Sequence, residues 1–230
     1  MCGRYVIARA VGDLVAETGA VPDESLGDPA DQERLRANWN TAPTTDVPIV
    51  LERLTGGDGR DDDGELVREL HVARWGLVPG WAKDPAVGSK MFNARSETVL
   101  EKPSFRKAVR ARRCAVPANG YYEWKKFGAK TKQPYFVHRG DHAPIFFAGL
   151  YGWWKDPSKA PGAGDAWLLS TTVLTAPIAY VRDTGERPRY YANAHENDTV
   201  VLAPVVAVAV VGGYGLLVWI YQLLAGPPTY

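Results

Sequence analysis

The spacing of apolar positions along the chain predicts mostly short strands. Runs rich in Val, Ile, Leu and aromatic residues, bounded by Gly, Pro and Asp, are typical of strands in a sheet-rich domain. The predicted strands cover residues 5–8, 47–54, 66–74, 114–117, 135–138, 145–150 and 167–173. The second and third of these flank a loop at 56–64 and therefore predict a hairpin, and a further loop is predicted at 27–32.

Only two segments follow the period of a helix. Residues 11–19 predict a weak helix that turns Leu14 and Val15 inward, and residues 104–113 predict a helix that begins after Pro103. The apolar side of the second helix is Phe105, Ala108 and Val109, and Arg106, Arg110 and Arg113 recur on another face at i, i+4 and i+7. Many short strands with few helices indicate an α+β fold dominated by sheet. A length of 230 residues fits one domain or at most two small ones.

The C-terminal segment departs from this pattern. Residues 200–225 contain no charged side chain, and the segment is long enough for a membrane-spanning helix. The alternatives are a pair of buried strands, 205–211 and 216–221, that turn at Gly212-Gly213, or a tail not adapted to its fold. We divide the chain into a globular domain at 1–198 and an apolar segment at 199–230, and favour buried strands over membrane contact.

The formal net charge of +1 hides an uneven distribution. Residues 1–73 carry 7 basic and 15 acidic side chains, whereas residues 74–139 carry 15 basic and 4 acidic, a net +11. A basic stretch of this kind is typical of proteins that bind a phosphate backbone; the alternative is a solvated surface facing the acidic first third.

Cysteine and histidine usage predicts neither a metal site nor a cofactor. The two cysteines, Cys2 and Cys114, exclude a disulfide-rich scaffold, and the four scattered histidines lack ligand spacing. The first residues contain no apolar h-region, so we expect a cytoplasmic protein in which Cys114 is a buried thiol.

Cys2 is the strongest candidate for chemistry. Methionine is removed before a small side chain, which would leave Cys2 with a free α-amine of pKa about 7.7–8.0 and a thiol of pKa about 8.5. Such a 1,2-aminothiol condenses with an aldehyde to a Schiff base and closes to a thiazolidine. An N-terminal nucleophile also suits amide hydrolysis, and chance placement of a cysteine at position 2 is the remaining alternative.

Six ordered motifs extend this prediction. They are Met1-Cys2-Gly3-Arg4-Tyr5, the segment from Asn38 to Thr44, the segment from Arg74 to Lys83, the segment from Phe92 to Thr98, Pro103-Ser104-Phe105-Arg106, and the segment from Arg113 to Trp124. In order and spacing they resemble the SRAP family (SOS response-associated peptidases), which crosslinks to abasic sites in DNA. The resemblance covers residues 1 to about 177. It implies a single domain with a barrel-like core of short strands and a few flanking helices.

The resemblance also implies roles for individual residues. Cys2 would attack the ring-opened aldehyde, Asn93 would orient the sugar or the amine, and Glu123 would move protons with a pKa raised by burial. Arg4 and Arg95 match positions that hold phosphates, and Pro43 lies in a motif that lines the pocket. We expect Trp75 in the core and Trp81 near DNA, and we add Arg106, Arg110 and Arg113 as DNA contacts.

One family feature is missing. The family histidine follows a Thr-Thr strand, but after Thr171-Thr172 this chain has Arg182 or Glu186 at the corresponding position, and the nearest histidine is His195. Its absence predicts slower chemistry rather than no crosslink, because the aminothiol reaction belongs to Cys2.

Three functions therefore compete. The first is a monomeric DNA-repair enzyme that crosslinks to abasic sites in single-stranded DNA, with lyase and self-processing peptidase character, near the nucleoid. The second is an N-terminal-nucleophile amidohydrolase. The third is a DNA-binding relative, weakened in catalysis or attached to a membrane through residues 200–225.

Overall fold

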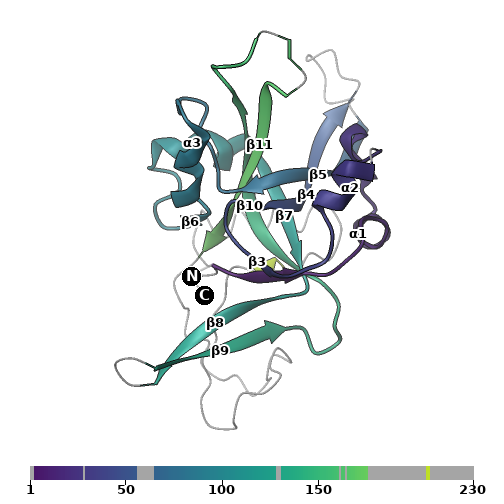
Figure 1. Ribbon diagram of the computed structural model, residues 1–230, viewed down its shortest axis with the longest axis vertical. Coiled ribbons are helices and arrows are strands. Elements are labelled where there is room, and N and C mark those ends of the chain that lie inside the picture. The colour runs from purple at the N-terminus through teal and green to yellow at the C-terminus, as the bar shows by residue number, and fades with distance from the viewer. Residues whose placement is uncertain are drawn as a thin grey trace, which may run out of the picture.

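A closed barrel of five strands forms the centre of the molecule (Figure 1). The computed structural model describes residues 3–27, 29–55, 65–127, 131–160, 162–163, 165–175 and 206–207. The barrel strands are β4 (Asp46–Thr55), β5 (Glu65–Trp75), β7 (Arg113–Ala118), β10 (Ile145–Lys155) and β11 (Trp167–Thr175). Their order is β10-β7-β4-β5-β11, and pairing of β10 with β11 closes the ring. The predicted α+β, sheet-rich fold with a barrel-like core is confirmed.

A second sheet lies across one end of the barrel. Its strand order is β3 (Asn38–Thr41), β1 (Tyr5–Ile7), β8 (Gly120–Phe127) and β9 (Thr131–His138), with every pair antiparallel. The β8–β9 hairpin extends beyond the barrel at the bottom of Figure 1. The aromatic side chains Tyr5 and Tyr121 fix this sheet to the barrel, because both contact Phe147 of β10 edge-on.

The helices are short and lie on the outside of the barrel. They are α1 (Val11–Thr18), the 3₁₀ helix η1 (Glu24–Gly27), α2 (Pro29–Arg34), the 3₁₀ helix η2 (Pro85–Lys90) and α3 (Pro103–Ala111). Helix α3 buries Phe105, Ala108 and Val109, as predicted, in a cluster with Leu150 and Leu174 of the barrel. Its two arginines, Arg106 and Arg110, face solvent.

Two predictions about local structure were wrong, and two strands of the second sheet were missed. The loop expected at 27–32 overlaps α2, which starts at Pro29, where the fixed φ of proline favours a first helical turn. The helix expected to reach Arg113 ends at Ala111, and Arg113 opens β7 opposite Leu150. Arg113 therefore does not continue the helical row of Arg106 and Arg110. Strands β3 and β8 were not predicted.

Three short strands extend the barrel sheet: β2 (Val21–Pro22) beside β5, β6 (Asn93–Arg95) beside β11, and β12 (Val206–Ala207) beside β10. Residues 206 and 207 belong to the predicted strand 205–211; the rest of that segment lies outside the described residues. Among the helices of the described ranges, none has the length and apolar character needed to cross a bilayer.

Candidate active site and nucleic-acid interface

An aromatic cluster brings the N-terminal strand and the Asn93 strand to the same end of the barrel. The rings of Tyr5 and Trp75 lie 5.1 Å apart, and those of Trp75 and Phe92 lie 5.9 Å apart, both edge-to-face. The indole N–H of Trp75 donates to the carbonyl of Phe92 at 2.9 Å. Trp75 is completely buried, as predicted. Since Arg4 precedes Tyr5 and Asn93 follows Phe92, this cluster holds the two predicted site segments in place.

The segment before Asn93 is held against the end of β5 by an unusually close backbone contact. Gly76 has φ +141°, and a Cβ on it would lie 2.5 Å from the carbonyl oxygen of Gly88; a Cβ on Gly88 would lie 2.4 Å from that of Gly76. The amide of Leu77 donates to Met91 at 3.1 Å. The amide of Val173 donates to Phe92 at 3.0 Å, and Asn93 then pairs with Val173 in β6.

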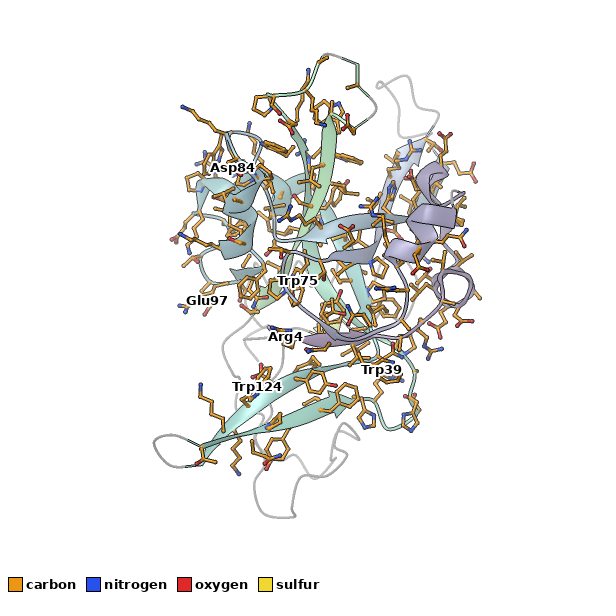
Figure 2. The ribbon with its side chains drawn as sticks, in the orientation of Figure 1. Arg4, Trp39, Trp75, Asp84, Glu97 and Trp124 are labelled. Atoms are coloured by element: carbon orange, nitrogen blue, oxygen red, sulfur yellow. The ribbon has the colours of Figure 1, made fainter. Side chains whose placement is uncertain are left out.

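Arg4 is fixed by both neighbouring strands. Its carbonyl accepts the amide of Tyr122 at 2.9 Å, and its guanidinium donates to Oδ1 of Asn40 at 3.3 Å. Because β1 and β8 are antiparallel and Tyr5 pairs with Tyr121, residues before Tyr5 lie toward Glu123, which is half-buried. Figure 2 shows Arg4 and Trp124 close to β1 and β8. Cys2 lies outside the described residues; the described chain begins at its neighbour, Gly3.

Pro43 lies in the turn after β3, and this turn is bonded to the same tryptophan. The amide of Thr44, at φ 74°, donates to the carbonyl of Trp75 at 2.7 Å, and the amide of Trp75 donates to Thr45 at 2.9 Å. The turn that carries Pro43 is therefore held against the aromatic cluster.

Trp81 projects from a turn that the barrel holds. Its side chain is 62 % exposed, while the next residue, Ala82, accepts the indole N–H of Trp154 at 2.7 Å. A fixed backbone with an exposed indole suits stacking on a base. Whether Trp81 meets DNA stays a prediction.

Most arginines of the acidic first third form ion pairs, whereas three of the arginines predicted to meet DNA form none among the described residues. Five ion pairs lie within the first third: Arg9–Glu17, Arg34–Asp46, Arg36–Glu33, Arg53–Glu69 and Arg68–Glu52. Within the part of the chain that the structure describes, the exposed guanidinium groups of Arg95, Arg106 and Arg110 form no ion pair with a carboxylate. Arg95 is on β6 and the other two are on α3, which lie on the same flank of the barrel in Figure 1. The positive charges of these three side chains are therefore not neutralised by ion pairs on this flank.

The second cysteine is a buried thiol of the barrel core. Cys114 is buried on β7, its Sγ lies 3.4 Å from Oγ1 of Thr171, and burial raises the pKa of its thiol to about 12. The thiolate is the reactive form, so at neutral pH this residue is a small core side chain. No group of three or more His, Cys, Asp or Glu side chains with the geometry of a metal site occurs among the described residues.

The sequence motifs contained residues whose roles only the structure shows. Asn40 lies in the second motif, but its contact with Arg4 joins positions 36 apart in the sequence. Gly76 lies in the third motif, and its contact with Gly88 likewise depends on folding. The three candidates for the missing histidine, Arg182, Glu186 and His195, lie outside the described residues.

The fold defines a class of two-sheet α+β proteins with a five-stranded barrel. In this fold the N-terminal strand lies beside the strand that carries Glu123, and the strand that carries Asn93 lies beyond Trp75. The chain matches the SOS response associated peptidase (SRAP) family over residues 1–202. It therefore belongs to this family.

Curated relatives support the same assignment. The abasic site processing protein YoaM of Bacillus subtilis is 33% identical over 200 residues, covering 86% of this chain and 78% of its own. YoqW of Bacillus phage SPbeta, also an abasic site processing protein, is 34% identical, covering 81% and 74%. The abasic site processing protein HMCES of Rattus norvegicus is 34% identical over a shorter stretch, 47% of this chain and 31% of its own.

Solved structures share the fold. A crystal structure of a protein from Bacteroides thetaiotaomicron matches with a TM-score of 0.59 and 26% identity, over 76% of this chain and 68% of its own. One from Bordetella bronchiseptica matches with a TM-score of 0.62 and 22% identity, over 100% and 94%. Residues 199–230 separately match the family of the periplasmic nitrate reductase protein NapE.

Proposed function

We propose that this protein processes abasic sites in single-stranded DNA by forming a covalent crosslink through Cys2. The observation that carries the proposal is the meeting of the N-terminal strand, the Glu123 strand and the Asn93 strand at one end of the barrel. Arg95, Arg106 and Arg110 lie on the flank beside it and form no ion pair among the described residues. Relatives that share this framework over most of the chain are abasic site processing proteins.

The chemistry starts once Met1 is removed. The α-amine of Cys2 adds to the aldehyde carbon of the ring-opened abasic sugar and loses water to give an imine. The thiol then adds to the imine carbon, its proton passes to nitrogen, and a thiazolidine ring closes. Glu123 supplies and accepts the protons of these steps, and the amide of Asn93 holds the sugar or the amine in place. An imine that does not close permits strand cleavage by elimination, which is the lyase activity we propose.

DNA binding is the task of the positively charged flank. Arg4 and Arg95 take phosphates next to the lesion, while Arg106 and Arg110 extend the contact along the strand. Arg113, on β7, contacts the DNA farther from the lesion. Pro43 lines the pocket, and Trp81 stacks on a flanking base. We propose that one copy of the chain acts alone, in the cytoplasm and near the nucleoid.

A gel assay tests the proposal against its alternatives. Purified protein is incubated with single-stranded DNA carrying one abasic site, and the mixture is separated under denaturing conditions. A shifted band that disappears in Cys2→Ala supports crosslinking. Glutaminase activity without such a band would favour an N-terminal-nucleophile amidohydrolase. Tight, salt-dependent binding with only a faint band would favour a DNA-binding relative weakened by loss of the family histidine.

We also propose that residues 199–230 are a separate module. The two family matches meet near this boundary, at 1–202 and 199–230. The segment 200–225 has the length to span a bilayer, whereas pairing of β12 with β10 supports a role within the fold. Vesicle flotation of the full chain and of residues 1–198 distinguishes a membrane-spanning segment from a strand of the fold. If the full chain floats with vesicles and residues 1–198 do not, the segment attaches the protein to a membrane.

A further inference from the structure

A row of aromatic rings follows the face of the second sheet that points away from the barrel. The ring centroids of Tyr122 and Phe136 lie 5.2 Å apart, those of Phe136 and His138 also 5.2 Å, and those of His138 and His142 again 5.2 Å. The last two pairs are stacked, with interplanar angles of 24° and 12°. We call these four residues the aromatic row.

The register of β8 and β9 fixes which face the row occupies. Tyr122 pairs with Phe136, and Gly120 pairs with His138, so these side chains lie on one face of the sheet. Tyr121, the next residue along β8, points to the opposite face and is buried against the barrel. A Cβ on Gly120 would lie 2.6 Å from the Phe136 ring, so the missing side chain makes room for that ring.

The row leads directly to a residue of the proposed active site. Arg4 is the cross-strand neighbour of Tyr122, since its carbonyl accepts the Tyr122 amide, and cross-strand neighbours share a face. The Tyr122 hydroxyl crosses β1 and donates to the carbonyl of Trp39 on β3 at 3.2 Å. The row therefore spans the sheet from Arg4 to the start of β10.

Two exposed indoles flank the row. Trp39 is 66 % exposed, and Trp124, which pairs with Pro134 on the same face as Tyr122, is 41 % exposed. Figure 2 labels both tryptophans and Arg4 on the second sheet, Trp124 on β8 and Trp39 on β3. Indoles left in water on a sheet bury little surface on folding, and beside a continuous row of rings they are available to stack on a partner.

The charge of the hairpin identifies the partner. Residues 120–138 contain four lysines, Lys125, Lys126, Lys130 and Lys132, against one acid, Glu123. Rigid aromatic rings in a basic setting suit single-stranded nucleic acid, whose bases stack while its phosphates meet cations. We propose that the aromatic row with Trp39 and Trp124 is an accessory stacking surface for the single strand that leaves the abasic nucleotide past Arg4. The proposal rests on the proposed function, which supplies the strand.

The chain contains matched controls for this surface. Trp153 of β10 and Trp167 of β11 are 41 % and 55 % exposed, close to the values for Trp124 and Trp39, but lie on barrel strands outside the second sheet. Trp39→Leu and Trp124→Leu are therefore compared with Trp167→Leu and Trp153→Leu. Melting temperatures of all four show whether each chain is folded.

Affinity is measured by fluorescence anisotropy with an undamaged oligothymidylate of about 20 nucleotides, longer than a single-strand site of this kind. We expect Trp39→Leu and Trp124→Leu to bind about 5- to 100-fold more weakly, with the salt dependence unchanged because no cation is lost. The two controls keep the affinity of the unsubstituted protein. Equal affinity in all four variants would overturn the proposal.

Two further measurements keep the result unambiguous. Crosslinking of an oligonucleotide of roughly 5 nucleotides with a central abasic site tests the proposed function by itself, and we expect the unsubstituted protein and Trp167→Leu to crosslink it equally. Failure of the unsubstituted protein to crosslink this short oligonucleotide would contradict the proposed function. The affinity comparison would still show whether the aromatic row binds single-stranded DNA. Photocrosslinking of an iodouracil-containing strand to the unsubstituted protein should yield adducts in peptides that contain Trp39 or Trp124. Adducts found only in other peptides would contradict the proposal. A dimer that Trp39→Leu dissociates would instead assign this face to a second copy of the chain.

Discussion

The contact between Gly76 and Gly88 makes Gly88→Ala a sharp test of how Asn93 is positioned. The new Cβ would lie 2.4 Å from the carbonyl oxygen of Gly76, about 1 Å inside ordinary van der Waals contact. The backbone of Gly88 has an ordinary φ, so the cost is one of space alone. Relief requires movement of the segment that carries Met91 and Phe92 into β6. A 1 Å misplacement of a reacting group costs up to about 100-fold in rate, and overpacking costs about 1–3 kcal/mol of stability.

Gly80→Ala is the matched control. It lies in the same connection, and a Cβ there has no atom within 4 Å. Single-turnover crosslinking is measured over a range of abasic-oligonucleotide concentrations, together with the melting temperature. We expect Gly88→Ala to lower the rate at saturating DNA by about 10- to 100-fold, with little change in the half-saturating concentration, and Gly80→Ala to match the unsubstituted protein. Equal saturating rates in two folded variants would refute the reasoning.

Four more predictions concern the buried thiol, the exposed arginines of α3 and the C-terminal segment. Cys114, whose pKa is raised to about 12, should resist iodoacetamide in the folded protein at pH 8, so that labelling gives one adduct per chain, on Cys2, and a second only after unfolding. The raised pKa also predicts that stability falls as pH rises above about 9, where the unfolded thiol ionises and the buried one does not, and that Cys114→Ala lessens this fall. Replacing Arg106 and Arg110 by Ala should reduce the slope of log affinity against log salt by about 1.4, whereas Arg36→Ala, which removes an arginine paired with Glu33, should leave it unchanged. Residues 1–198 alone should retain Cys2-dependent crosslinking in the gel assay, because every described site residue lies before position 176.

The elements that the sequence predicted best are those whose apolar pattern is local. Strands β4 and β5 and the buried side of α3 are encoded by runs of neighbouring residues. Strand β8 was missed because Gly-Tyr-Tyr-Glu-Trp alternates between two aromatic faces, so no polar side marks the strand. Only the structure shows that one face packs on the barrel and the other faces solvent.

The burial of individual tryptophans could not be predicted from neighbouring residues either. Trp39 lies between two asparagines and Trp75 directly follows Arg74, yet Trp75 is completely buried and Trp39 is 66 % exposed. The difference depends on strand order: Trp75 ends a barrel strand under β1, and Trp39 lies on the edge strand β3. The contacts of Arg4 with Asn40 and of Gly76 with Gly88 are likewise products of folding. Residue identity and motif order predicted the site residues; their arrangement required the pairing of distant strands.

The most direct test of the proposed activity is the mass of the crosslinked product. Protein and abasic single-stranded DNA are incubated without reductant, and the adduct is measured by intact mass spectrometry for the unsubstituted chain, Cys2→Ser and Cys114→Ala. Cys2→Ser keeps the α-amine but lacks the thiol that closes the ring. The account predicts a stable adduct for the unsubstituted chain and Cys114→Ala, and none for Cys2→Ser. The mass of this adduct equals that of the chain without Met1 plus that of the DNA, minus one water. A stable adduct of equal yield in Cys2→Ser, or one that retains Met1, would contradict it.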